Sequence, residues 1–140
     1  MMGDWESDLC ELAAVEGGKV YDFVRYADDF LVLYKGTDEQ LASFVDRLNV
    51  KEPSLQVTLE EEMSGRLPFL DIWIERKPNG FQTSVYRKPS NSGQVIPYSS
   101  FTQPQYLTSA IRSEATRAYR YCSSLRKRES ELRYAVHRFT

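Results

Sequence analysis

The sequence predicts an α+β fold, an antiparallel sheet of about five strands with a helix packed on one face and a helical appendage after it. Two observations lead to this prediction. Several segments before residue 88 are β-rich or alternate hydrophobic with polar residues, whereas hydrophobic residues recur at helical spacing from about residue 105 onward. With 140 residues, 41% of them hydrophobic and 27% charged, the chain can bury a core without disulfide or metal support.

The first part of the chain predicts a helix, two strands and a second helix. Residues 5–16 place apolar side chains at helical spacing, and Gly17-Gly18 ends that pattern. After the strands, Thr37 to Gln40 fits a capping box with acidic residues in the first helical turn. The helix that this box opens is expected to end near Asn49 and to bury Leu41, Phe44, Val45 and Leu48.

The two strands between these helices predict a hairpin with carboxylates at its tip. The runs 21–26 and 30–34 are β-rich, and Ala27-Asp28-Asp29 between them are residue types that turn a chain readily. Adjacent acids at such a place are often only turn formers. Because successive strand side chains point to opposite faces, one carboxylate can also face a groove while the other points elsewhere.

A three-stranded meander is expected next. Residues 55–63, 68–77 and 81–88 read as strands, with turns at Ser64-Gly65 and at Pro78-Asn79-Gly80, and Asn-Gly is a strong hairpin signal. Alternation along the middle strand puts Leu70, Ile72 and Ile74 on the core face. On this reading Asp71 is a structural residue among core positions.

Two helices are expected to end the chain. Residues 89–105 are rich in Pro, Ser, Gly and Gln and read as a connection, followed by helices over about 105–125 and 129–139. We therefore divide the chain into residues 1–98, which hold the sheet, and residues 99–140, which are helical. The first helix is expected to bury a stripe from Leu107 to Leu125 that includes Ile111, and the second to bury Leu132, Ala135, Val136 and Phe139.

Charge is divided unevenly along the chain. Residues 1–70 carry fifteen acidic and six basic side chains, a net charge of −9, and residues 71–140 carry five and twelve, a net charge of +7. Acidic groups that hold cations and basic groups that hold phosphates are expected together in proteins that act on nucleic acid. The alternative is an acidic and a basic surface that attract each other.

Composition and cysteine usage indicate an intracellular protein. No apolar run approaches the roughly 20 residues that a membrane span needs, and the N-terminal stretch is acidic where a signal peptide is basic. Cys10 and Cys122 lie far apart and lack the spacing of a zinc site, so reduced, buried thiols are expected. We expect no membrane partner.

The acidic pair suits Mg²⁺ chemistry. Mg²⁺ prefers oxygen ligands and keeps several waters, so a projecting carboxylate, a second one from a neighbouring strand and substrate phosphates can hold it. Two such ions about 4 Å apart activate an attacking 3′-hydroxyl and stabilise a leaving pyrophosphate, which is the chemistry of polymerases.

Three motifs resemble those of a known family. The segment RYADDFLVLYKG resembles the carboxylate-bearing hairpin in the palm of reverse transcriptases, and PFLD and VYRKP follow it in the order and spacing of the Penelope-like retroelement enzymes. The Ser/Pro-containing stretch and the basic, Ala-rich helices after them are also similar, so the resemblance covers roughly residues 9–139. Ser90 to Gln94 departs from it, since the family usually has a Thr-rich stretch there.

The resemblance implies a palm-type sheet, a thumb-like helical segment and a set of site residues. Asp28 would bind both Mg²⁺ ions, Asp29 would be a secondary ligand, and Tyr26 would pack near the primer terminus. The partners would be an RNA template, a DNA primer and deoxynucleoside triphosphates, in the nucleus or a cytoplasmic ribonucleoprotein. Side chains expected to contact nucleic acid, besides Tyr26, are Arg87, Lys88, Arg112, Arg117, Arg120, Arg126, Lys127 and Arg128.

Other functions stay open at this point. By family analogy a further metal-binding carboxylate lies on a strand before Met1, so this chain is expected to be the C-terminal part of a longer polymerase and inactive without the upstream half. It can instead be a non-catalytic nucleic-acid-binding module, helix-turn-helix in outline, or a degenerate remnant that associates through unpaired strands. Exposed aromatic residues would suit base stacking, although such side chains are more often core; the candidates are Tyr98, Phe101, Tyr106, Tyr119 and Tyr121.

Overall fold

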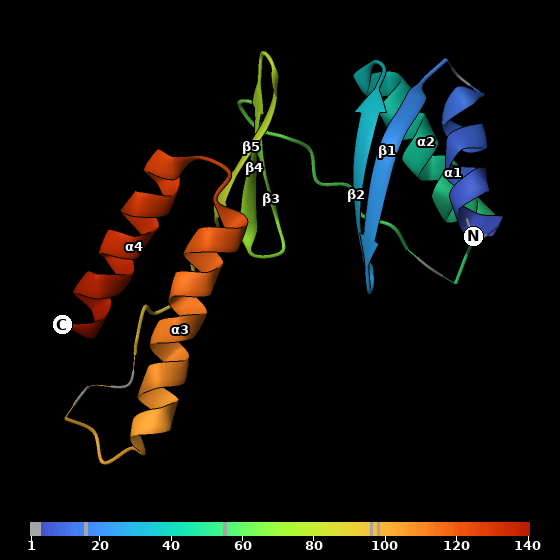
Figure 1. Cartoon of the computed structure of the whole chain (residues 1–140). Helices are drawn as coiled ribbons and strands as arrows, with labels where there is room; N and C mark the ends of the chain where they lie inside the picture. The colour runs from blue at the N-terminus through green and yellow to red at the C-terminus, as the bar shows by residue number, and fades with distance from the viewer. Residues whose placement is uncertain (1–3, 16, 55, 96, 98) are drawn as a thin grey trace. The chain divides into compact units, whose positions relative to one another are not determined.

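The fold is α+β, with antiparallel sheets and four helices in the described part of the chain (Figure 1). The computed structural model describes residues 4–15, 17–54, 56–95, 97 and 99–140, and divides the chain into two compact units, Met1–Glu60 and Glu61–Thr140. The elements in chain order are α1 (Asp4–Ala14), β1 (Lys19–Tyr26), β2 (Asp29–Lys35), α2 (Asp38–Lys51), β3 (Arg66–Phe69), β4 (Ile72–Lys77), β5 (Gly80–Val85), α3 (Pro104–Tyr121) and α4 (Leu125–Phe139).

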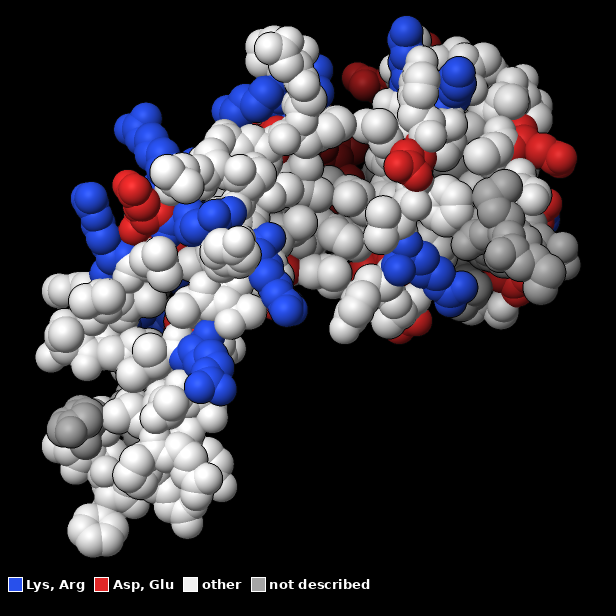
Figure 2. Space-filling view, viewed as in Figure 1, with Lys and Arg blue, Asp and Glu red and all other residues white. Residues whose placement is uncertain are grey.

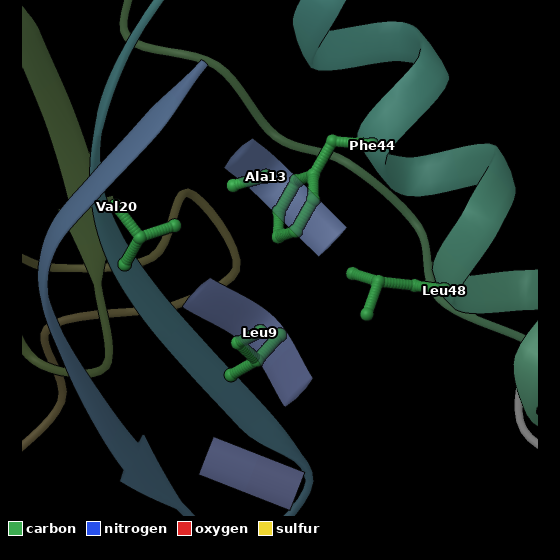
Figure 3. Packing of buried hydrophobic residues seen from close by; sticks show 5 residues of the cluster. All are labelled: Leu9, Ala13, Val20, Phe44 and Leu48. Atoms are coloured by element: carbon green, nitrogen blue, oxygen red, sulfur yellow. The ribbon is translucent and has the colours of Figure 1, made fainter. Parts of the chain in front are cut away.

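In the first unit two helices pack on a hairpin. β1 and β2 pair antiparallel, and α1 and α2 lie against one face of the pair (Figure 1). The buried side chains come from both helices and from β1, so the helices bury their apolar stripes against each other and against the hairpin. This core consists of Leu9, Ala13, Val20, Phe44 and Leu48 (Figure 3).

The predicted capping box at the start of α2 is confirmed. The Thr37 hydroxyl oxygen accepts a hydrogen bond from the Gln40 amide at 3.2 Å, and Gln40 Oε1 accepts one from the Thr37 amide at 2.9 Å. The helix ends at Lys51, slightly beyond the expected Asn49. The Asn49 side chain is bonded to the segment that follows, since its Oδ1 accepts from the Val57 amide at 2.6 Å and its Nδ2 donates to the Val57 carbonyl at 3.2 Å.

The predicted single sheet of about five strands is wrong, because the described residues form a two-stranded sheet, β1-β2, and a three-stranded sheet, β3-β4-β5. No strand is assigned within residues 56–62, where one was expected; Met63 makes only an isolated bridge to Arg66. Alternation alone therefore does not make this segment a strand, since strand pairing needs a neighbour in register.

The predicted middle strand is divided into two by a tight turn. Phe69 pairs with Ile72, and Leu70 between them has a positive φ of 53°, so the chain reverses at Leu70-Asp71 and β3 and β4 form a hairpin of their own. The reversal places the Asp71 side chain in solvent, 61% exposed, and the expected position of Asp71 among core residues is wrong.

The helical pair follows a different boundary from the predicted one. α3 ends at Tyr121 and α4 starts at Leu125, because the Ser124 hydroxyl oxygen accepts a hydrogen bond from the Lys127 amide and caps α4. Ala118 and Cys122 are buried as expected. Other positions of the predicted apolar stripes are exposed instead, namely Ile111, Leu125, Leu132 and Val136.

The short connection between α3 and α4 is bonded to the edge strand β5. The Ser123 amide donates to the Thr83 carbonyl at 3.1 Å, and the Thr83 amide donates to the Ser123 hydroxyl at 2.9 Å. These bonds satisfy polar groups that an edge strand would otherwise present to solvent. The sheet and the two helices thus belong to the same unit, Glu61–Thr140, and the proposed boundary after residue 98 does not coincide with a division between compact units.

Both cysteines are free thiols, but only one is buried. Cys122 is 2% exposed, and this burial raises the pKa of its thiol, against the lowering effect of a backbone hydrogen bond from Val85. Cys10 lies on the exposed side of α1, so its expected burial is wrong. Within the described residues, no helix combines the length and apolar character that crossing a membrane requires.

Candidate functional site

The predicted acidic hairpin is formed. Tyr26 pairs with Asp29, so Ala27 and Asp28 make a two-residue turn between β1 and β2. The side chains of Asp28 and Asp29 are exposed, and so is Tyr26, at 62%. The structure therefore brings both carboxylates and the tyrosine to one end of the hairpin.

The turn carries an unusual backbone conformation. Ala27 has a positive φ of 50°, a region that a residue with a Cβ adopts at a cost of roughly 1–2 kcal/mol. Arg25 stabilises this conformation, since its Nε donates to the Ala27 carbonyl at 3.1 Å while its guanidinium lies 5.4 Å from the centre of the Phe30 ring. A positive φ is common at the central residues of two-residue hairpin turns, and Leu70 has one in the β3–β4 turn as well.

The donor set at this turn fits part of a magnesium site. Asp28 and Asp29 supply the carboxylate oxygens that Mg²⁺ prefers, and both are open to solvent, which allows an ion to keep several of its waters. Among the residues that the structure describes, no three His, Cys, Asp or Glu side chains lie together as a metal-binding group. Asp22, further along β1, accepts a hydrogen bond from the neighbouring Phe23 amide at 2.9 Å and is not brought to the turn.

The basic candidates fall into two groups, and the first of them points into solvent. Lys88 follows β5, Arg112 and Arg120 lie on α3, and Arg126 lies in the first turn of α4; all four are exposed. No hydrogen bond, ion pair or ring contact to another described residue engages their side chains. In the view of Figure 2, Lys and Arg side chains gather over the helical pair with few acidic ones among them.

The second group is bonded within the protein, and Arg87 is its centre. Its Nη2 lies 2.6 Å from a Glu131 carboxylate oxygen and 3.7 Å from one of Glu114, and its guanidinium lies 4.1 Å from the centre of the Tyr134 ring. Burial acts to lower the pKa of Arg87, but the hydrogen bond and charge of Glu131, with further contributions from Tyr134 and Glu114, leave it raised. The guanidinium is thus held as a structural cation between β5, α3 and α4.

The remaining candidates of this second group also have partners. Arg117 lies 4.0 Å from Asp71 and 3.8 Å from Glu114, and Lys127 Nζ lies 3.5 Å from a Glu75 oxygen. Arg128 Nη2 donates to the Cys122 carbonyl at 3.3 Å, and its guanidinium lies over the Tyr119 ring. These contacts join the two helices to each other and to the sheet, so these side chains are poor candidates for contacts with phosphate.

Arg133 of α4 is an exposed basic residue that was not among the predicted contacts, and several of the aromatic candidates for base stacking are exposed. Arg133 is exposed and lies seven residues after Arg126, a spacing that puts both on one side of α4 and that the sequence itself contains. Phe101, Tyr106 and Tyr119 are exposed, whereas Tyr121 is half-buried and Tyr98 lies outside the described residues.

A known protein family matches the C-terminal part of the chain. Residues 94–140 match the animal helix-turn-helix domain, and this range contains α3, the three-residue connection and α4. No curated protein and no solved structure matches the chain. The sequence of the helical pair is therefore similar to that of a helix-turn-helix domain.

Proposed function

We propose that this chain is the C-terminal palm and thumb-like part of an RNA-directed DNA polymerase similar to the Penelope-like retroelement enzymes. The observation that carries this proposal is the acidic hairpin, in which Asp28 and Asp29 stand exposed at a turn held in an unfavourable backbone conformation. The motifs PFLD and VYRKP support it, since both lie in the second unit in the order that the resemblance implies.

In this proposal the residues of the hairpin have separate roles. Asp28, in the turn, is the principal metal ligand, Asp29 gives secondary or electrostatic support, and Tyr26 packs near the end of the primer. Two bound Mg²⁺ ions would supply activation of the primer hydroxyl and stabilisation of the leaving pyrophosphate. The substrates are an RNA template, a DNA primer and deoxynucleoside triphosphates, met in the nucleus or in a cytoplasmic ribonucleoprotein, and the upstream half of the polymerase supplies the remaining carboxylate.

Primer extension by the polymerase that includes the upstream half tests this proposal. Asp28→Asn removes the ligand charge and is expected to lower the rate by roughly 100-fold or more, as loss of one electrostatic group at a reaction centre commonly does. Asp22→Asn is the matched control, because Asp22 is an exposed acid on the same hairpin but away from the turn. Extension by Asp28→Asn that stays within about tenfold of the unchanged enzyme removes the metal role of Asp28.

A second candidate function is nucleic-acid binding without catalysis. It is favoured by the helix-turn-helix match at residues 94–140 and by the exposed arginines of α3 and α4. Such side chains bind the phosphate backbone and position a protein on nucleic acid without reading its sequence. In this case Asp28→Asn leaves binding unchanged, whereas changes to the exposed arginines Arg112, Arg120 and Arg126 weaken it. The two functions are compatible, since a thumb-like segment would hold the template and primer.

A further inference from the structure

The outer side of α4 carries a straight line of polar and basic residues. Arg126, Ser130, Arg133 and His137 follow one another at intervals of four, three and four residues, which is the spacing of one helix face. All four are exposed. Ala135, the buried residue of this helix, lies two residues from Arg133, or roughly 200° around the helix axis, so the line faces away from the packed side. We call these four residues the α4 basic line.

The arginines of this line differ from the other cations of α4 in having no protein partner among the described residues. On the inner side, Lys127 contacts Glu75, and Arg128 donates to the Cys122 carbonyl. Arg138 lies 3.4 Å from Glu114 and is 12% exposed. The inner cations of α4 are therefore engaged within the fold, whereas the side chains of Arg126 and Arg133 are open to solvent.

The side chains next to the α4 basic line help to distinguish a lipid headgroup from nucleic acid as the anion that it would bind. Leu125, Leu132 and Val136 are exposed next to the α4 basic line, an arrangement that a membrane-surface helix also shows. Glu129, however, lies between this apolar edge and the arginines and is exposed, so no continuous apolar face borders them. The match of residues 94–140 to a helix-turn-helix domain favours nucleic acid over lipid.

We propose that the α4 basic line binds the sugar–phosphate backbone of duplex nucleic acid, with Arg126 and Arg133 on phosphates and the Ser130 hydroxyl as an additional donor. This inference rests on the proposed nucleic-acid binding of the helical pair and assigns the side chains that carry it. Each arginine bound to a phosphate displaces a condensed counterion, so binding weakens with salt in proportion to the number of such contacts.

The salt dependence of binding by the 140-residue chain tests the assignment. Affinity for a 20-base-pair DNA duplex of arbitrary sequence is measured by fluorescence anisotropy at several salt concentrations. Changing Arg126→Gln and Arg133→Gln together is expected to reduce the slope of log affinity against log salt by about 1.8, or about 0.9 for each phosphate contact. Lys19→Gln with Lys35→Gln makes the same change of net charge in the first unit and is expected to leave the slope unchanged.

A second variant, which removes a negative charge instead of a positive one, is expected to change the affinity in the opposite direction. Glu129→Gln removes a carboxylate beside the α4 basic line without removing a contact, so it is expected to tighten binding and to keep the slope. Because all three positions are exposed, circular dichroism is expected to show the same helical content for each variant. Absence of duplex binding by the unchanged chain contradicts the nucleic-acid function itself, and the inference with it.

Two further outcomes would overturn the role of the α4 basic line without contradicting nucleic-acid binding by the chain. Duplex binding whose slope is unchanged in the double arginine variant, or is reduced equally by the lysine control, overturns the assignment while leaving nucleic-acid binding in place. Binding to vesicles of phosphatidylserine and phosphatidylcholine, lost in the double variant while duplex binding persists, shows that the line serves a lipid surface and also overturns it.

Discussion

At the scale of single residues, the basic side chains of residues 71–140 fall into two kinds, those paired with carboxylates and those exposed to solvent. The resemblance pointed to Arg87 and Arg117 as nucleic-acid contacts, yet both are bonded to carboxylates. Glu114 alone is approached by three guanidinium groups, those of Arg87, Arg117 and Arg138, at 3.4–3.8 Å. A carboxylate shared in this way reduces the repulsion between cations that meet where β5, α3 and α4 join. Positive charge in this unit is therefore partly a stabilising feature of the fold.

Glu75 makes the stability of the second unit sensitive to acid. A hydrogen bond from Lys77 at 3.0 Å lowers the pKa of the Glu75 carboxyl below its ordinary 4.5, against the effect of burial, and Lys127 adds to the lowering. A carboxyl with a lowered pKa stabilises the folded state above its unfolded pKa, and this contribution is lost as the pH falls through its folded pKa. Glu75→Gln is thus expected to destabilise by about 1 kcal/mol or less at pH 7.

Glu75→Gln is also expected to make the free energy of unfolding depend less on pH. Urea unfolding followed by circular dichroism between about pH 6 and pH 3 should show a smaller loss of stability for Glu75→Gln than for the unchanged chain. Glu61→Gln, which alters an exposed carboxylate in the segment before β3, serves as the control and should keep the original profile. Equal profiles for the unchanged chain and Glu75→Gln would contradict the role of Glu75.

At the scale of elements, the β1–β2 turn stores conformational strain. Ala27 has a positive φ that glycine adopts freely, so Ala27→Gly relieves the strain and is expected to raise the free energy of unfolding by about 1 kcal/mol. The urea midpoint of the 140-residue chain measures this gain. Ala14→Gly, at the exposed end of α1, is a control in which glycine is not expected to stabilise. A midpoint that is unchanged or lower in Ala27→Gly would mean that the turn is not strained.

Elements held by nearby residues were predictable, and those held by distant ones were not. The capping box at Thr37 and the acidic turn follow from residues within a few positions of each other. The break at Leu70 could not be predicted, because leucine rarely adopts a positive φ and the period-two pattern passes through the turn without interruption. The candidate site shows the same division: the partner of Arg87 is Glu131, and no spacing along the chain reveals this ion pair.

At the scale of the whole molecule, the chain consists of two compact units with separate hydrogen-bonded sheets. The boundary falls at Glu60-Glu61, within a segment that has neither helix nor strand over residues 56–62. Exposed segments of this kind are preferred sites of proteolysis. A protease that cuts after glutamate is expected to cleave first at Glu60 or Glu61 and to leave two resistant fragments, which mass spectrometry of a short digestion identifies.

The glutamates of the helices provide the internal comparison for this digestion. Glu114 and Glu131 lie within α3 and α4 and are only partly exposed, so cleavage there should follow much later. First cuts inside either helix would contradict the division into two units.

The hydrogen bonds between Ser123 and Thr83 have a consequence for hydrogen exchange in the second unit. Because the Thr83 amide donates to the Ser123 hydroxyl, its hydrogen exchange with solvent is slowed only while the connection between α3 and α4 stays seated on β5. Movement of this connection away from β5 breaks these bonds and opens the Thr83 amide to solvent. The hydrogen-exchange rate of the Thr83 amide therefore reports whether the connection between α3 and α4 is bonded to β5.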